Sequence, residues 1–245
     1  MVDKFHAIPV AMDDDEIKTD ISKNRFALLT EIFKKLFTLF PGVAYGLLLE
    51  TSILLPSIVQ ACLSLRLTFV PLDSLETLYQ VNDVCEFCIT ENEITSLEEF
   101  RFIAINWHQF DVSPEDLLLI QSIKLFRKVN YITCKVFELN QFAYVMLTSG
   151  STGVPKRVYV PFDCIYSNIK SISENLCLTE CDVVLSCSPF TFDPAIVDIM
   201  LCLYSGASLI YIPDYIKYQP RRMSRVIQRN KVSIIQSQDL VSILQ

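Results

Sequence analysis

The sequence lacks an excess of basic residues. Lys and Arg number 21 against 28 Asp and Glu, so the formal net charge is -7 at pH 7. Proteins bind the phosphate backbone of nucleic acids through clustered Lys and Arg, so this balance argues against nucleic acid as the main partner. Four arginines between residues 221 and 229 recur at helical spacing, which is typical of the solvent-exposed face of a helix.

The sequence also lacks the residues of a common metal site. It has two histidines, His6 and His108, and nine cysteines without a regular framework. Cys85 and Cys88 have the spacing of zinc ligands, but no second pair at matching spacing accompanies them. We therefore expect reduced cysteines, with Cys85 and Cys88 as small buried hydrophobic residues, and no metal site.

The first twenty residues lack the basic start, apolar centre and small-residue cleavage site of a secretory signal, which predicts a cytoplasmic protein. The apolar stretch 47–70 is interrupted by Glu50, Pro56 and Arg66. It therefore fits a strand-helix-strand segment better than a membrane span, and no membrane partner is expected. A hydrophobic content of 51% excludes global disorder.

The order of elements predicts an α/β fold with a mostly parallel sheet and covering helices. Residues 1–25 are polar and include the acidic run 13–16, so we expect a solvated, frayed segment there. The length allows one large domain or two small ones between residues 26 and 245, and residues 73–140 allow no assignment of elements. The predicted helices are 26–40, 52–67, 195–206 and 221–230, and the predicted strands are 43–50, 68–73, 143–148, 182–188, 207–213 and 232–236.

The segment YVMLTSGSTGVPKRVYV, residues 144–160, contains a candidate anion-binding loop. Its glycines allow successive amide N–H groups to converge, its hydroxyls add donors, and Lys156 adds a positive charge. We expect the oxygens of a triphosphate to bind to this loop. Pro155 excludes the P-loop pattern, and the spacing of a dinucleotide fingerprint is missing. A flexible Ser/Gly linker is the alternative, but the tract is short and lies between two strand-like runs.

This loop resembles the signature loop of the adenylate-forming, or AMP-dependent synthetase/ligase, superfamily, which includes acyl-CoA synthetases, luciferases and nonribosomal adenylation domains. Two further segments agree. Residues 67–73, LTFVPLD, resemble the family's Ala-Tyr-Val-Pro-Leu-Asp segment, although Arg66 stands where a glycine is usual. Residues 190–200, FTFDPAIVDIM, resemble the Phe-Asp-x-Ser segment of amino-acid-activating members, with Ala195 in place of the serine.

The resemblance implies that a carboxylate attacks the α-phosphate of ATP with Mg2+, and that the acyl adenylate passes to a thiol, often on a phosphopantetheine carrier domain. It implies phosphate contacts from the loop and a catalytic role for Lys156 and Thr148. It also implies that Asp193 binds the ammonium of a substrate such as β-alanine; a compatible alternative is that Asp193 caps a helix beginning near Pro194. The implied phosphate-binding residues are Thr148, Ser149, Gly150, Ser151, Thr152, Gly153 and Lys156.

The family's later segments, which position adenine, metal and ribose and supply the lysine of its mobile carboxy-terminal domain, have no counterpart before Gln245. We therefore expect the first part of a large amino-terminal domain, without the downstream half and the small carboxy-terminal domain. Activation of an amino acid would then be incomplete in this chain. The alternative is a catalytically inactive remnant that acts as a nucleotide-binding or protein-interaction module, which leaves open whether the chain alone is an enzyme.

Overall fold

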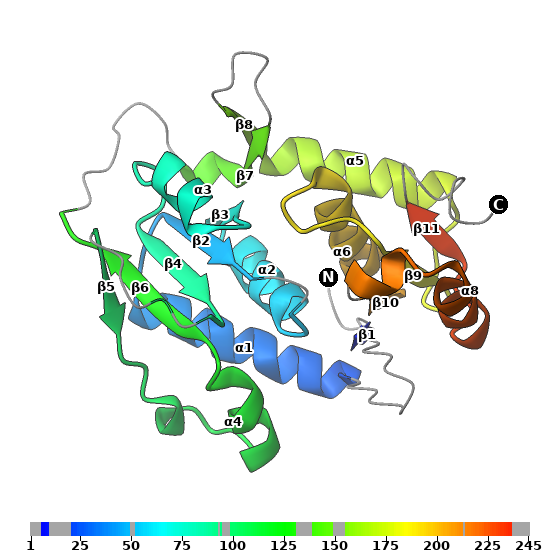
Figure 1. The fold of residues 1–245 in the computed structure, drawn as a ribbon, viewed down its shortest axis with the longest axis horizontal. Helices are drawn as coiled ribbons and strands as arrows, with labels where there is room; N and C mark the ends of the chain where they lie inside the picture. Colours follow the sequence, from blue (N-terminus) through cyan, green and yellow to red (C-terminus); the bar gives the residue numbers. More distant parts are fainter. Residues whose placement is uncertain are drawn as a thin grey trace. The chain divides into compact units, whose positions relative to one another are not determined.

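The computed structural model describes residues 6–9, 21–49, 52–92, 94, 99–130, 139–148, 155–212 and 214–236. The chain divides into two compact units, each built around its own β-sheet (Figure 1). Unit 1 comprises Met1–Leu28, Thr51–Pro56 and Tyr166–Gln245. Unit 2 comprises Leu29–Glu50 and Ser57–Ile165.

The sheet of unit 2 has seven strands in the order β5-β6-β4-β2-β3-β7-β8. Strands β4, β2, β3 and β7 pair in parallel, whereas β5, β6 and β8 join the sheet through antiparallel pairs. The strands are β2 (Ala44–Leu48), β3 (Thr68–Pro71), β4 (Phe87–Thr90), β5 (Phe100–Ile103), β6 (Lys124–Lys128), β7 (Phe142–Thr148) and β8 (Lys156–Pro161). The accompanying helices are most of α1 (Lys23–Leu39), α2 (Leu55–Ser64), α3 (Leu75–Gln80), η1 (Trp107–Gln109), α4 (Pro114–Ile120) and η2 (Leu139–Gln141).

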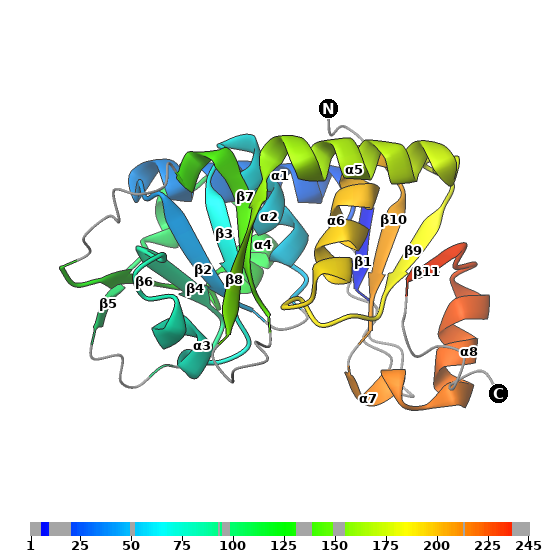
Figure 2. The same ribbon diagram turned by 90° about the horizontal axis from the view of Figure 1, so that it is seen from above.

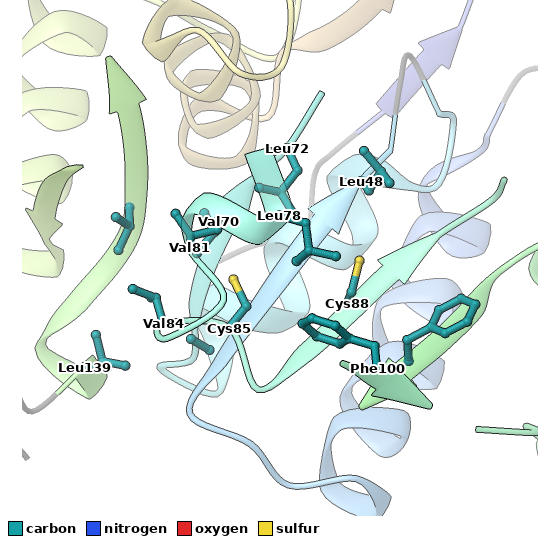
Figure 3. Packing of buried hydrophobic residues seen from close by; sticks show 13 residues of the cluster. Leu48, Val70, Leu72, Leu78, Val81, Val84, Cys85, Cys88, Phe100 and Leu139 are labelled. Carbon is teal, nitrogen blue, oxygen red and sulfur yellow. The ribbon is translucent and has the colours of Figure 1, made fainter. Parts of the chain in front are cut away.

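Consecutive residues of β2 face opposite sides of this sheet, and both sides are covered. The Tyr45 ring packs against Phe37 of α1 and Phe87 of β4, with ring centroids 4.6 and 5.2 Å away. On the other side, a Cβ added to Gly46 would lie only 2.8 Å from a methyl carbon of Leu72. Figure 3 shows this second layer, which includes Leu78 of α3. Burial on both faces explains the continuous apolar run in the sequence.

The predicted β-α-β unit is confirmed, because β2 and β3 are parallel and joined by α2. The turn after α2 forms with Arg66 in the left-handed region, at φ 54°. An L-residue there costs about 1–2 kcal/mol relative to the right-handed conformation. The Arg66 guanidinium lies 5.2 Å from the centroid of the Phe162 ring, a cation–π contact that offsets part of this cost.

The sheet of unit 1 has four parallel strands in the order β1-β10-β9-β11. They are β1 (His6–Pro9), β9 (Val183–Ser186), β10 (Ser208–Tyr211) and β11 (Ile234–Gln236). Helix α6 (Asp193–Ser205) packs on β9 and β10, as Figure 2 shows. The other helices are most of α5 (Phe162–Asn175), α7 (Asp214–Lys217) and α8 (Pro220–Arg229), whose buried Met223 and Val226 cluster with Leu185 of β9 and Ile210 of β10.

Strand β1 lies in the segment 1–25, where the sequence pattern predicted no strand. Residues 6–9 pair in parallel with β10, in the register His6↔Ser208. The short apolar run beside the acidic residues supplies an edge strand, and helix α1 begins at Lys23, earlier than the predicted residue 26. The acidic run 13–16 lies outside the described residues.

Further predictions about the fold can be compared with the described residues. Six of the nine strand pairings are parallel, as expected for a mostly parallel sheet. Arg221, Arg225 and Arg229 are exposed on α8. Cys85 and Cys88 are fully buried in the layer of Figure 3. No helix within the described residues is both long enough and apolar enough to cross a membrane.

Candidate functional site

Strands β7 and β8 form an antiparallel hairpin, and the candidate phosphate loop connects them. Strand β7 is buried from Ala143 to Met146 and pairs in parallel with β3, which fixes its position in the sheet. The predicted strand 143–148 is therefore confirmed. The predicted loop residues Ser149, Gly150, Ser151, Thr152 and Gly153 lie outside the described residues.

The hairpin brings Thr148 and Lys156 together at the two ends of this loop. They are cross-strand partners in the register, and the Thr148 hydroxyl lies 3.4 Å from the carbonyl oxygen of Lys156. Both residues are exposed. Within the described residues Lys156 has no ion pair. A hydroxyl donor and a cation at the two ends of one loop can both interact with phosphate oxygens.

Arg157, the residue after Lys156 on β8, forms an ion pair that the sequence pattern did not predict. The Arg157 guanidinium donates to Asp83 Oδ2 at 2.7 Å and to the Gln80 carbonyl at 2.5 Å. Partial burial raises the pKa of the Asp83 carboxyl, but the hydrogen bond and charge of Arg157 outweigh it and leave that pKa below its usual value. Asp83 comes from the stretch 73–140, whose pattern assigned no elements, so no local signal indicated the contact.

Asp193 is the first residue of helix α6 and is exposed. Phe192 occupies the N-cap position, and its side chain makes no capping hydrogen bond. The expectation that Asp193 caps a helix beginning near Pro194 is therefore wrong: the helix starts one residue earlier, with Pro194 in its first turn. A carboxylate in the first turn is favoured by the positive end of the helix dipole.

Helix α6 itself is embedded in the protein. Every residue from Ala195 to Leu203 is buried, including the carboxyl group of Asp198. A helix that is apolar all round is expected to be buried, so Asp198 is the exception in this run. Asp193 belongs to unit 1, whereas Thr148 and Lys156 belong to unit 2.

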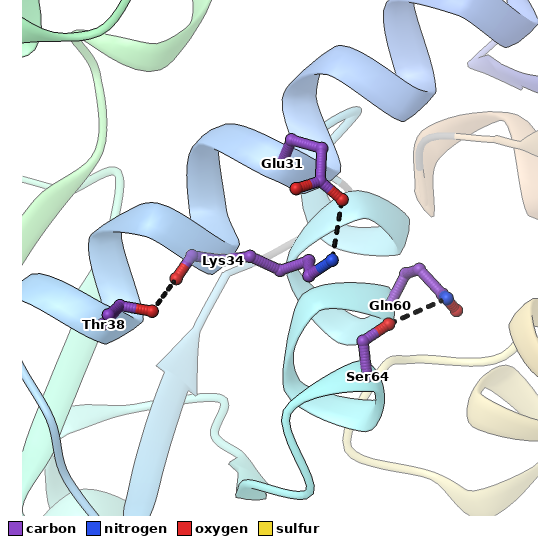
Figure 4. A network of polar contacts seen from close by, with 5 residues as sticks. All are labelled: Glu31, Lys34, Thr38, Gln60 and Ser64. Carbon is purple, nitrogen blue, oxygen red and sulfur yellow. Dashed lines mark hydrogen bonds and ion pairs between the residues drawn. The ribbon is translucent and has the colours of Figure 1, made fainter.

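The structure also has a groove of about 480 Å³ in unit 2. Its lining includes Lys34 of α1, which pairs with Glu31 at 2.7 Å in the polar network of Figure 4. Exposed pairs of this kind stabilise a helix only weakly. None of the described residues predicted for the phosphate or amine sites lines this groove, so it is not part of the candidate site. The lining residues are Glu31, Lys34, Lys35, Thr38, Leu39, Leu65, Gln109 and Phe110.

Comparison with known proteins agrees with the resemblance predicted from the loop and its flanking segments. The family model described as "AMP-binding enzyme" matches residues 37–238. The beta-alanine-activating enzyme of Danio rerio is 32% identical over 210 residues, which cover 79% of this chain and 18% of that protein. The chain therefore spans about a fifth of the length of this curated relative.

Solved structures share the fold at lower identity. A four-domain nonribosomal peptide synthetase bound to AMP and glycine has a TM-score of 0.67 and 18% identity, with 89% of this chain and 16% of that chain covered. The o-succinylbenzoate coenzyme A synthetase of Bacillus subtilis, in complex with ATP and magnesium, has a TM-score of 0.68 and 19% identity, with 99% and 62% covered. These likenesses confirm the predicted α/β fold of an adenylate-forming enzyme's amino-terminal part.

Proposed function

Because this chain belongs to the AMP-binding enzyme family, we propose that it serves the ATP-dependent activation of an amino-acid carboxylate as an acyl adenylate. The proposed amino acid resembles β-alanine, which the name of the Danio rerio relative supports. The proposed acceptor is a phosphopantetheine thiol on a carrier domain. A nonribosomal peptide synthetase with AMP and glycine bound supports the pairing of nucleotide and amino acid. Residues 26–245 would form the first part of the adenylation domain.

The observation that supports the proposal is that Thr148 and Lys156 are cross-strand partners at the two ends of the loop. In the reaction, a carboxylate oxygen forms a bond to the α-phosphorus while the bond to pyrophosphate breaks. Negative charge then develops on the phosphate oxygens, so a preorganised hydroxyl donor and a free ammonium stabilise the transition state. We assign these two roles to Thr148 and Lys156, with residues 149–153 as further phosphate contacts.

Magnesium would enter with the nucleotide as MgATP and add positive charge at the phosphates. Within the described residues no group of three or more His, Cys, Asp and Glu side chains is arranged to hold a metal ion.

Asp193 is the proposed partner of the substrate ammonium. Its carboxylate is exposed at the first turn of α6, and the buried helix behind it provides a rigid support. Asp193→Asn keeps the shape and removes the negative charge, so we expect β-alanine binding to weaken about tenfold while MgATP binding stays unchanged. Isothermal titration calorimetry with each ligand measures both. Unchanged β-alanine affinity would contradict the assignment.

The test of the whole proposal is β-alanine-dependent exchange between ATP and pyrophosphate by the full chain. We expect Lys156→Ala to reduce the exchange rate at least about tenfold, because a charge-assisted contact to phosphate is lost. Lys170→Ala is the matched control, since Lys170 is 61% exposed on α5 and far from the loop in sequence.

A different outcome would favour a nucleotide-binding module. In that case exchange is absent, but MgATP still binds and Lys156→Ala weakens the binding. If neither exchange nor Lys156-dependent MgATP binding occurs, the proposed function is wrong, and a protein-interaction role is left as the alternative.

A further inference from the structure

Four buried oxygen atoms in unit 1 have no hydrogen-bond partner within the described residues. They are Ser186 Oγ, both carboxyl oxygens of Asp198, and the hydroxyl oxygen of Tyr211. Asp198 is 0% exposed, Ser186 1% and Tyr211 5%. Buried polar groups in folded proteins are nearly always hydrogen-bonded, so such a concentration of unpaired atoms calls for a specific explanation.

The fold directs these side chains toward each other. Ser186 and Tyr211 are register partners at the ends of the adjacent strands β9 and β10. Leu185 and Ile210, one residue earlier on each strand, pack against the side that carries α8. Because successive strand residues alternate sides, Ser186 and Tyr211 face the opposite side, where α6 carries Asp198.

Three described weak acids interact electrostatically with Asp198. Cys187 follows β9, Cys202 lies on α6 and Tyr211 on β10, and each has its pKa raised by burial and by the Asp198 charge. Lys217 of α7 is also buried, and its charge lowers the pKa of Cys187. Burial raises the pKa of Asp198 to about 7, and the nearby Ser186 hydroxyl, which stabilises the charged carboxylate, opposes this rise in part. An ionised carboxylate buried without a partner is costly, which favours its neutral form.

We propose that Asp198 is a proton-carrying positioning residue: as a neutral acid it exchanges hydrogen bonds with Ser186 and Tyr211, directly or through an enclosed water, and its ionisation displaces the start of α6. A neutral carboxyl both donates and accepts, as do the two hydroxyls, so a closed network satisfies all four oxygens. Once ionised, the carboxylate requires hydration, and α6 must move away from the sheet to admit water.

The displacement reaches Asp193 for a geometric reason. Asp198 follows Asp193 by five residues, which is about 7.5 Å along the helix. Six residues, 187–192, join Ser186 at the end of β9 to Asp193. Ser186 lies just before the connection 187–192, and Asp198 lies on the helix just after it. A change in the contacts of these two residues therefore acts on both ends of the connection. The link to substrate rests on the proposed role of Asp193 in binding the amine.

The first experiment compares the thermal unfolding of the full chain and of Asp198→Asn between pH 5 and pH 8. An acid whose folded pKa is raised contributes stability that is fully present below its unfolded pKa, 3.8, and is lost as pH rises through its folded value, about 7. We expect the Tm of the wild type to fall relative to the variant by roughly 3 °C or more over this range. Parallel profiles would overturn the proposal.

Glu174→Gln is the matched control, because Glu174 is an exposed carboxylate of the same unit. Its Tm should run parallel to that of the wild type. If Asp198→Asn does not fold, carbon-13 NMR of wild-type protein labelled at Asp carboxyls decides the question. One carboxyl resonance titrating near pH 7 supports the proposal, and titration of every Asp near its ordinary value overturns it.

The second experiment measures β-alanine binding by calorimetry at pH 6 and pH 8. We expect affinity to decrease at the higher pH in the wild type and to stay constant in Asp198→Asn. Equal affinities in the wild type would overturn the coupling to Asp193. If β-alanine binds at neither pH, the proposed function and the coupling both fail, while the unfolding profiles still decide whether Asp198 carries the proton.

Discussion

Helix α6 carries the residue proposed to bind the amine, and the β7–β8 hairpin carries residues proposed to bind phosphate, but the two elements are held in different ways. Helix α6 is buried at every position from Ala195 to Leu203. On β8, Lys156 and Val158 are exposed, and the hairpin is fixed by its strand ladder and by the Arg157–Asp83 ion pair. Apolar burial stabilises in proportion to buried area, whereas a half-exposed ion pair contributes little.

The proposed amine-binding and phosphate-binding residues therefore lie on elements that are packed to different degrees. A helix locked by packing can hold the Asp193 carboxylate in one position. The hairpin lies at the edge of its sheet, and the residues of β8 are exposed or half-buried. Substitutions should therefore act on stability when they fall in α6, and on ligand binding when they fall on the hairpin.

The largest effect is expected for Ile199→Ala, because Ile199 is fully buried in α6. The cavity should lower the free energy of unfolding by about 2–5 kcal/mol. Val158→Ala is the control on the hairpin, where the side chain is 45% exposed, and should change it by less than about 0.5 kcal/mol. Urea denaturation of both variants measures the contrast, and equal losses would remove the distinction between the two regions.

A smaller effect is expected at the end of α6, where Gly206 has φ 80°. Gly206→Ala places a Cβ in the left-handed region and should cost about 1–2 kcal/mol. The reverse change at the end of α2, Arg66→Gly, relieves backbone strain but loses the contact with Phe162. It should therefore change stability by less than about 1 kcal/mol. If Gly206→Ala is neutral in urea denaturation, the helix end does not depend on that conformation.

The ion pair under the hairpin should contribute less than about 1 kcal/mol at neutral pH, because Arg157 and Asp83 are 31% and 44% exposed. The pKa of Asp83 is lowered, so its contribution is present above the unfolded value of 3.8 and is lost as pH falls through the folded value. A double-mutant cycle with Asp83→Asn and Arg157→Met should show coupling at pH 7 that shrinks at about pH 3. Constant coupling would show that the charge of Asp83 is not involved.

The smallest effect on stability is expected for Lys156→Ala, because the side chain is exposed and makes no ion pair within the described residues. The free energy of unfolding should change by less than about 0.5 kcal/mol. The same substitution should weaken MgATP binding about tenfold, through the loss of a charged contact. A large loss of stability would mean that Lys156 supports the hairpin instead of serving a ligand.

The sequence pattern predicted the β-α-β unit, strand β7, helix α6 and the solvent face of α8, because apolar periodicity is a local property. It missed strand β1, whose short apolar run makes sense only beside β10. It also placed no elements between residues 73 and 140, where β4 pairs with both β2 and β6. Such pairings depend on distant partners, which local spacing does not contain.

For the candidate site, the sequence by itself determined the chemistry: a hydroxyl-rich loop ending at Lys156 suits phosphates, and Asp193 beside Pro194 marks a helix start. Only the tertiary structure decided that Thr148 lies opposite Lys156, that Arg157 reaches Asp83, and which acids are buried. Asp193 and Asp198 share one short segment, yet one is exposed and the other fully buried. The physical reason is that packing between distant elements determines how far a carboxyl group is exposed to water and which groups interact with it. Exposure and neighbouring groups in turn determine whether the carboxyl group is ionised.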